Sequence, residues 1–336
     1  REGDVYIAAG SQGDAVSGDQ VRVAVSQKKG WKKGLGSSGK ILEVLTRGRA
    51  EYVGTLFKRG KGWLAQPDGR ELHDPIIIRD ATSKNAKAGD KVVFEMLHYP
   101  EKDHYGEGVI TSVLGDAGRP DVETQAVILA FGLHQEFDEE SKIEARNATK
   151  HFEETGDDDR EDLTKTFIFT IDPPDAKDFD DAINISYDSD RQEWELGVHI
   201  ADVASFVTID SALDKGAIER GNSVYLPRHV VPMLPEVLSN GVCSLQEGVR
   251  RWAKSAFIRF DKKGRVVGQR FSNSVICSEK RLTYIEAQAL IDGDEKEARK
   301  NTVTGGEYST QLLETLALAD RLAKTLLARR RRDGMI

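Results

Sequence analysis

An unusual concentration of carboxylates marks residues 172–181, which read DPPDAKDFDD and hold five aspartates. Two consecutive prolines stop the preceding strand at Asp172, so the carboxylates share one short loop. Two bare charges about 4 Å apart repel by roughly 4 kcal/mol at an effective dielectric near 20. Unless they take up protons, such a group needs a cation to be stable. Because its ligands are hard oxygens, the loop favours Mg²⁺ or Mn²⁺ over Zn²⁺.

A cation held by this loop could do phosphoryl chemistry. A bound metal can activate water and stabilise charge on a transferring phosphoryl group, and two metals about 3.5–4 Å apart would clamp the attacking and leaving oxygens. Spacing alone leaves two other interpretations open. One is a calcium-binding loop, although this segment lacks the glycine that the EF-hand pattern requires. An exposed acidic turn is the other, although the apolar runs FIFTI (167–171) and AINI (182–185) place the loop at strand ends, where function concentrates.

Strands and helices mixed around the loop predict an α/β (α+β) domain that starts near residue 166. Beyond the two flanking strands, the run WELGVHI at 194–200 predicts a third. A helix begins at Asp210 or Ser211 and ends at Gly221, and another begins near Thr283.

A long helix is predicted from about Ser309 to Arg332. Its last four residues are arginines, and their positive charges are stabilised by the negative C-terminal end of the helix dipole. Its apolar stripe consists of Leu312, Leu316, Ala319, Ala323 and Leu326.

A repeat is visible in the N-terminal third. The segment GDQVRV at 18–23 is echoed by GDKVVF at 89–94, and about twenty residues later both copies read G-x-I-x-x-V-L, at 39–45 and 108–114. Short alternating apolar runs separated by glycine predict the β-strands of small barrels. Further strands at 52–57, 62–66 and 76–78 precede the second copy, whereas only 17 residues precede Gly18. We therefore expect the chain to begin inside its first barrel.

Composition limits the class of protein. The 336 residues carry a formal net charge of −8, with 31% charged and 39% hydrophobic residues, as in ordinary soluble proteins. No apolar run approaches the roughly 20 residues that cross a bilayer, and the longest, at 126–133, predicts a helix or a buried strand. Cys243 and Cys277 form no CxxC pair, which disfavours a disulfide framework or a zinc site and fits a reducing cytoplasm.

The charge is unevenly distributed along the chain. Residues 1–70 hold 13 basic and 7 acidic residues, whereas residues 136–181 hold 6 basic and 17 acidic residues. The acidic total therefore permits one face that attracts polyanions and a separate pocket rich in carboxylates.

The aspartate segment, extended to TIDPPDAKDFDDA (170–182), resembles the signature of the ribonuclease II/ribonuclease R (RNB) family of exoribonucleases. The blocks VHIADV (198–203), NSVYLP (222–227), VPMLPEVLSNGVCSL (231–245) and RLTY (281–284) are similar to further family blocks, closest to ribonuclease R. The resemblance implies all-β cold-shock, OB-type barrels followed by a mixed α/β RNB catalytic domain. We expect a partial first barrel at 1–48, a second barrel at 49–116, a connector at 117–165 and the N-terminal part of the catalytic domain at 166–336.

The resemblance also implies an activity. The family's exoribonuclease II-type hydrolases degrade single-stranded RNA from its 3′ end and release nucleoside 5′-monophosphates. Asp172, Asp178, Asp180 and Asp181 match the family's four catalytic aspartates and would hold one or two Mg²⁺ ions, with Mn²⁺ as the alternative. Asp172 and Asp181 are the expected direct ligands. We expect a cytoplasmic monomer whose partner is the 3′ end of single-stranded RNA, with no membrane association.

Candidate RNA contacts come from the same resemblance. Tyr225 matches a tyrosine that stacks on a terminal base, and Tyr284 matches an aromatic that shapes the RNA end of the channel. OB barrels bind single strands through basic grooves and stacking aromatics. The candidate groove residues here are Phe57, Lys58, Arg59, Lys61 and Trp63. For each of these five, ordinary barrel core or solvated loop is an equally open interpretation.

One expectation concerns what this sequence can do alone, and two alternative functions stay open. The family's phosphate-contacting arginine, its downstream carboxylate and its C-terminal RNA-binding domain have no counterpart here, so we expect weak or no hydrolysis by residues 1–336. The alternative function is a non-catalytic RNA-binding or RNA-chaperone module with a vestigial metal loop. A sugar-phosphate or pyrophosphate hydrolase is a third interpretation, which leaves the barrels unexplained.

Overall fold

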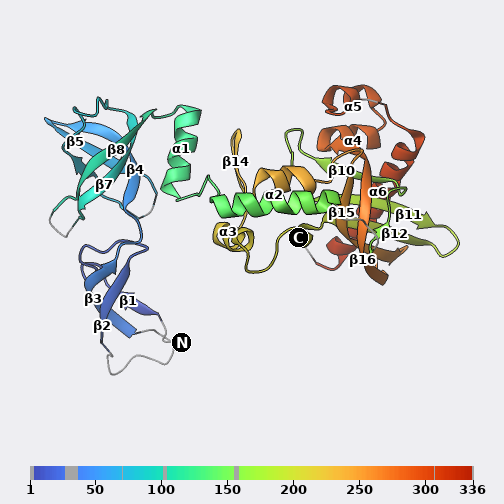
Figure 1. The fold of residues 1–336 in the computed structure, drawn as a ribbon, viewed down its shortest axis with the longest axis horizontal. Coiled ribbons are helices and arrows are strands. Elements are labelled where there is room, and N and C mark those ends of the chain that lie inside the picture. The colour runs from blue at the N-terminus through green and yellow to red at the C-terminus, as the bar shows by residue number, and fades with distance from the viewer. Residues whose placement is uncertain are drawn as a thin grey trace. The chain divides into compact units, whose positions relative to one another are not determined.

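The computed structural model describes residues 4–26, 37–69, 71–100, 104–154, 159–305 and 307–334. The chain divides into two compact units, and Figure 1 shows the elements of each. The first unit comprises residues 1–135 and the hairpin at 224–231, and the second comprises residues 136–223 and 232–336.

A three-stranded sheet and a closed barrel make up most of the first unit. The sheet has the order β1-β3-β2, with β1 Val5–Ile7, β2 Gln20–Ser26 and β3 Ser37–Thr46. The barrel has the order β4-β5-β6-β8-β7, with β4 Glu51–Arg59, β5 Gly62–Pro67, β6 Ile76–Ile78, β7 Asp90–His98 and β8 Glu107–Asp116. The helix α1 Pro120–Ala130 packs on the outside of the barrel through Ala126, which contacts Val53 and Val93. The hairpin consists of β13 Val224–Leu226 and β14 His229–Val231.

The predicted repeat is present in the backbone. In the sheet, β3 pairs in parallel with β1 and antiparallel with β2, and in the barrel β8 pairs in the same way with β6 and β7. Gly18 and Gly89 both have a positive φ, of 96° and 95°. The aspartate that follows each glycine accepts a hydrogen bond from the backbone N–H three residues earlier, at 3.0 Å and 2.7 Å. The sheet therefore repeats the topology of the last three strands of the barrel.

A sheet that closes on itself organises the second unit. Its strands are β9 Glu161–Asp162, β10 Ile168–Asp172, β11 Asp181–Asp188, β12 Glu193–Ala201, β15 Arg250–Asp261 and β16 Val266–Thr283. They have the order β10-β11-β12-β15-β16-β9, and β10 also pairs in parallel with β16. The helices are α2 Glu139–Glu154, α3 Ala212–Arg220, α4 Tyr284–Ile291, α5 Glu295–Asn301 and α6 Thr310–Arg332, with short helical turns at Val203–Ser205 and Val237–Val242.

Apolar cores lie against both faces of β10. Ile168 packs in one core with residues such as Leu238 and Trp252, whereas its neighbour Phe169 packs in another with Leu282 and Leu312. Figure 1 shows α2 and α3 on one side of the sheet and α4, α5 and α6 on another. A strand buried on both faces needs no polar alternation, which explains the continuous FIFTI run.

Most predicted helix ends are present, and one predicted stripe is partly wrong. Ser211, Thr283 and Ser309 each cap a helix by accepting a hydrogen bond from a backbone N–H three residues later. In α6, however, Ala323 is exposed and Leu322 is buried in its place, because the helical repeat carries the core face from Leu316 through 319 to 322. The apolar run at 126–133, for which strand and helix were both open, belongs to α1 up to residue 130. None of the described helices has the length and apolar character needed to span a membrane.

Candidate functional site

Sheet topology brings the ends of the aspartate loop together. Asp172 is the last residue of β10, and Asp181 is the first residue of β11, its antiparallel neighbour. The end of one strand and the start of the next therefore share a sheet edge. Asp178 and Asp180 belong to the loop that joins the two strands. The parallel ladder pairs Asp172 with Thr283, so α4 also begins at this edge.

The carboxylates of the loop are close enough to oppose one another's ionisation. Partial burial raises the pKa of Asp172 to about 6, and the negative charges of Asp181 and Asp178 add to the shift. The pKa of Asp180 is also raised, first because the surrounding protein partly desolvates its carboxylate and then because Asp178 and Asp181 are negatively charged. Part of its side chain nevertheless reaches solvent. These shifts are the expected result of gathering like charges in a partly buried loop.

The donor chemistry of the loop fits a hard divalent cation. The Oδ2 atom of Asp172 is buried and has no hydrogen-bond partner, so it is an oxygen ligand left without a donor. In the described part of the chain, no three carboxylate, imidazole or thiol groups already converge at metal-binding distances. A divalent cation among these carboxylates would replace their mutual repulsion with attraction.

Contacts from a distant segment fix the backbone of the loop. Phe179, in the middle of the loop, is buried in the core of the second unit. Its N–H donates to Ser244 Oγ at 3.1 Å, and its carbonyl accepts from the N–H of Leu245 at 2.9 Å. Ser244 Oγ in turn donates to the carbonyl of Lys177 at 2.7 Å. The apolar ring and these hydrogen bonds hold the loop without using the carboxylates on either side of Phe179, which can therefore bind a ligand.

Sequence reasoning missed the two side chains that hold the loop. Ser244 and Arg281 both lie in segments that resemble family blocks, but neither had a predicted role. Arg281 donates hydrogen bonds to backbone carbonyls of the loop more than a hundred residues earlier. The only sequence signal was indirect: a loop with two consecutive prolines has few N–H groups for a backbone ladder, so other segments must hold it.

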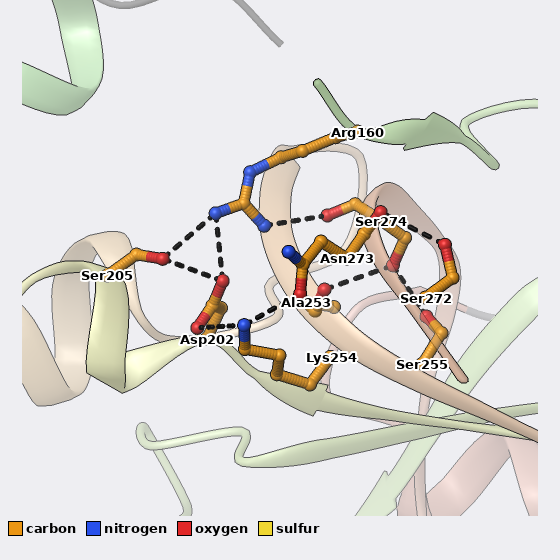
Figure 2. A network of polar contacts seen from close by, with 9 residues as sticks. All are labelled: Arg160, Asp202, Ser205, Ala253, Lys254, Ser255, Ser272, Asn273 and Ser274. Atoms are coloured by element: carbon orange, nitrogen blue, oxygen red, sulfur yellow. Dashed lines mark hydrogen bonds and ion pairs between the residues drawn. The ribbon is translucent and has the colours of Figure 1, made fainter. Parts of the chain in front are cut away.

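His199, on β12, and Asp202, which directly follows that strand, have structural roles. His199 is fully buried, with Nε2 2.9 Å from Asn184 Oδ1 and Nδ1 2.7 Å from Ser255 Oγ, and burial lowers its pKa to about 4. Asp202 accepts hydrogen bonds from Arg160 at 2.8 Å and from the hydroxyl of a nearby serine at 2.7 Å (Figure 2). Both belong to internal hydrogen-bond networks and not to the aspartate loop.

The two tyrosines proposed to contact RNA are exposed. Tyr284 is the first residue of α4, at the sheet edge that carries Asp172, and its side chain is 60% exposed. Tyr225 lies on β13 and is 62% exposed. Exposure of a large aromatic ring suits stacking on a base, and the position of Tyr284 places such a ring at the aspartate edge.

The barrel candidates divide between the two faces of a hairpin. Lys58 and Trp63 are paired across β4 and β5, and the Lys58 ammonium lies 4.4 Å from the centre of the indole ring, which also packs against the barrel core. Phe57 lies on the opposite face, because successive residues of a strand alternate in direction. Arg59 and Lys61 are exposed at the turn. The two aromatics therefore do not form one stacking surface, whereas the three cations share one hairpin tip.

Comparison with known proteins decides the family. Residues 160–336 match the model of the RNB domain, and residues 65–138 match that of the cold shock domain. The chain belongs to the RNB family. Over its whole length this RNB chain is 32% identical to ribonuclease R 1 of Lactococcus lactis subsp. lactis, of which it covers 41%. The resemblance inferred from the aspartate segment and its companion blocks is thus confirmed.

Solved structures support the same assignment for the fold of the RNB chain. RNase R of Mycoplasma genitalium, solved in complex with ribose-methylated single-stranded RNA, is 25% identical with a TM-score of 0.75, over 98% of this chain and 50% of that one. Yeast Ssd1, a pseudonuclease, is 20% identical with a TM-score of 0.59, over 95% of this chain and 38% of its own, and shows the fold alone. The chain thus spans half or less of the length of these relatives.

Proposed function

We propose that this protein is a divalent-metal-dependent 3′-to-5′ exoribonuclease that hydrolyses single-stranded RNA to nucleoside 5′-monophosphates. The observation that carries the proposal is the gathering of Asp172, Asp178, Asp180 and Asp181 at one sheet edge of an RNB-family domain. Because the chain spans 41% of the L. lactis relative and 50% of the M. genitalium structure, the proposal concerns the whole protein that contains these residues.

The reaction exchanges one bond at phosphorus for another. The oxygen of a water molecule bonds to the phosphorus of the last phosphodiester, the P–O3′ bond breaks, and the departing 3′ oxygen takes up a proton. One or two Mg²⁺ or Mn²⁺ ions would supply activation of water and stabilisation of charge on the phosphoryl oxygens. Asp172 and Asp181 would be their direct ligands. Asp178 and Asp180 would complete the site, and one of them would orient the water.

The rest of the chain would bind and orient the RNA. The loop anchored by Phe179 holds its carboxylates before substrate arrives, which saves the cost of ordering them during the reaction. The exposed ring of Tyr225 would stack on a terminal base, and that of Tyr284 would shape the RNA end of the channel. The cations of the β4–β5 tip would attract the phosphate backbone without reading sequence.

A labelled-RNA assay tests the proposal. The full-length protein should release a 3′ label at once as a mononucleotide and shorten a 5′-labelled strand step by step, and EDTA should stop both. Asp180→Asn should slow turnover by at least about 100-fold, whereas Asp175→Asn, the same change at an exposed position of the same loop, should not. The proposal fails if the Asp180→Asn protein degrades RNA as fast as the wild type. Residues 1–336 alone should show weak turnover or none.

A second candidate function is a non-catalytic RNA-binding or RNA-chaperone module, and the match of residues 65–138 to the cold shock domain favours it. In this case the aspartate loop would be a vestige, and the barrel with its basic tip would carry the activity. Tight RNA binding by the full-length protein, with no turnover in Mg²⁺ or Mn²⁺, would favour it over the exoribonuclease.

A further inference from the structure

Arg281 reaches across from β16 to the proline half of the aspartate loop. Its Nη2 atom lies 2.9 Å from the carbonyl oxygen of Pro174, 3.2 Å from that of Ala176 and 3.4 Å from that of Pro173. Its guanidinium carbon lies 4.6 Å from the centre of the Phe179 ring. One side chain therefore contacts both the start of the loop and its buried anchor.

The loop needs this contact because of its own sequence. Pro173 and Pro174 have no N–H groups, so this stretch cannot be fastened by a backbone ladder as a strand would be. Within the loop, the N–H of Ala176 bonds to the carbonyl of Pro173 at 3.2 Å, which leaves the carbonyls of Pro174 and Ala176 to find donors elsewhere. All three contacts come from Nη2 of Arg281, so its two N–H donors are shared among these carbonyls.

Arg281 is itself held in place. It is paired with Thr170 in the parallel ladder between β16 and β10, and its backbone N–H donates to Glu247 Oε2 at 2.8 Å. Its side chain is only half-buried, and in the described part of the chain no ion pair joins its guanidinium to a carboxylate. Its hydrogen bonds go to carbonyls, although aspartates are its neighbours in the loop. The arginine thus braces the backbone of the loop and leaves the carboxylate oxygens unoccupied.

We propose that Arg281 is a positioning residue that sets the conformation in which the four aspartates receive a divalent cation, and that lysine cannot replace it. The inference rests on the proposed metal-dependent function. Loss of an outer-shell contact that orients metal ligands commonly weakens metal binding by about 10–100-fold. Lysine would keep the charge, but its flexible stem and compact ammonium lack the planar group that stacks on the Phe179 ring, so its donor would not be held against the loop carbonyls.

Mn²⁺ titration of the chain, followed by the electron paramagnetic resonance signal of free Mn²⁺, tests this role. Arg281→Lys keeps the positive charge, and Arg281→Met removes it but retains an unbranched side chain. If Arg281 positions the loop, both variants should raise the dissociation constant by about 10–100-fold. If only its charge mattered, methionine would tighten Mn²⁺ binding by removing a repelling cation and lysine would leave it unchanged, and either result would overturn the proposal.

A matched control and a second measurement separate positioning from folding. Arg329→Lys makes the same change on α6, where the guanidinium donates to the carbonyl of Gly264 at 2.7 Å, and should leave Mn²⁺ binding unchanged. Hydrogen exchange at the N–H groups of Ala176 and Phe179 should speed up in the two Arg281 variants, with no change in β12 or β15. If the wild-type chain binds no Mn²⁺, the metal part of the proposed function fails, and exchange at these two amides still decides the role of Arg281. Unchanged exchange would overturn it.

Discussion

Removing one charge from the aspartate loop should make the metal-free protein more stable. The pKa of Asp172 is raised to about 6 in the folded chain, from an ordinary value of 3.8. A carboxyl with a raised pKa resists ionisation in the folded state, so above pH 6 its charge works against folding. At 1.36 kcal/mol for each pKa unit, the difference amounts to about 3 kcal/mol at pH 7.5. In EDTA, Asp172→Asn should therefore raise the free energy of unfolding by about 1–3 kcal/mol, because Oδ2 of Asp172 has no hydrogen bond to lose.

The assay has to follow the second unit separately, because the chain has two units. The protein is equilibrated in urea with EDTA and given a brief deuterium pulse, and peptides from β10 and β11 report unfolding of the second unit. Peptides from the β4–β8 barrel serve as the internal reference. Asp175→Asn is the control, since it removes an exposed charge from the same loop.

Lowering the pH or adding Mg²⁺ should each remove the stability advantage of Asp172→Asn over the wild type. As the pH falls from 6 to 4, wild-type Asp172 takes up its proton in the folded state, and the advantage of Asp172→Asn should vanish. Mg²⁺ at 100 times its dissociation constant should stabilise the wild type by about 2.7 kcal/mol and the variant far less. An Asp172→Asn protein that is no more stable in EDTA at pH 7.5, or that gains as much from Mg²⁺ as the wild type, would refute the reasoning.

Three further predictions follow from contacts described above. Phe179→Ala should destabilise the second unit by about 3–5 kcal/mol in the same urea assay, because it empties a buried site. Between pH 7.5 and 4.5 the free energy of unfolding of the wild type should fall by about 2.5 kcal/mol more than that of His199→Gln. The reason is that unfolded histidine takes up a proton near pH 6.5, whereas folded His199 does so only near pH 4. Equal losses would show that His199 titrates normally. Replacing Lys58, Arg59 and Lys61 together by alanine should reduce the slope of log K against log salt for single-stranded RNA by about 2 in a fluorescence anisotropy titration, and an unchanged slope would place RNA elsewhere.

Local signals in the sequence predicted the elements of the second unit well. The helix caps at Ser211, Thr283 and Ser309 depend on residues three positions apart, so a short window contains the whole signal. The strands on either side of the aspartate loop were equally readable, because β10 is apolar on both faces and prolines end it. The four aspartates could be placed in one loop for the same reason.

What the sequence did not disclose depends on contacts between distant segments. Arg281 and Ser244 bond to a loop more than sixty residues away, and nothing near either residue in the sequence announces that partner. The barrel aromatics show a different limit. Phe57 and Trp63 are close in sequence, but the register of β4 against β5 decides their faces, and register is set by the whole barrel.

The division of labour within residues 172–181 also bears on how such a loop can change over generations. The shape of the loop depends on the buried ring of Phe179 and on hydrogen bonds that its backbone makes with Ser244, Leu245 and Arg281. None of these contacts uses an aspartate side chain. Mutation of an aspartate to a neutral residue would therefore remove charge repulsion and leave the scaffold intact. A lineage that no longer needs hydrolysis could lose the acids one by one without passing through an unstable intermediate. In such a lineage the buried phenylalanine should outlast the acids beside it.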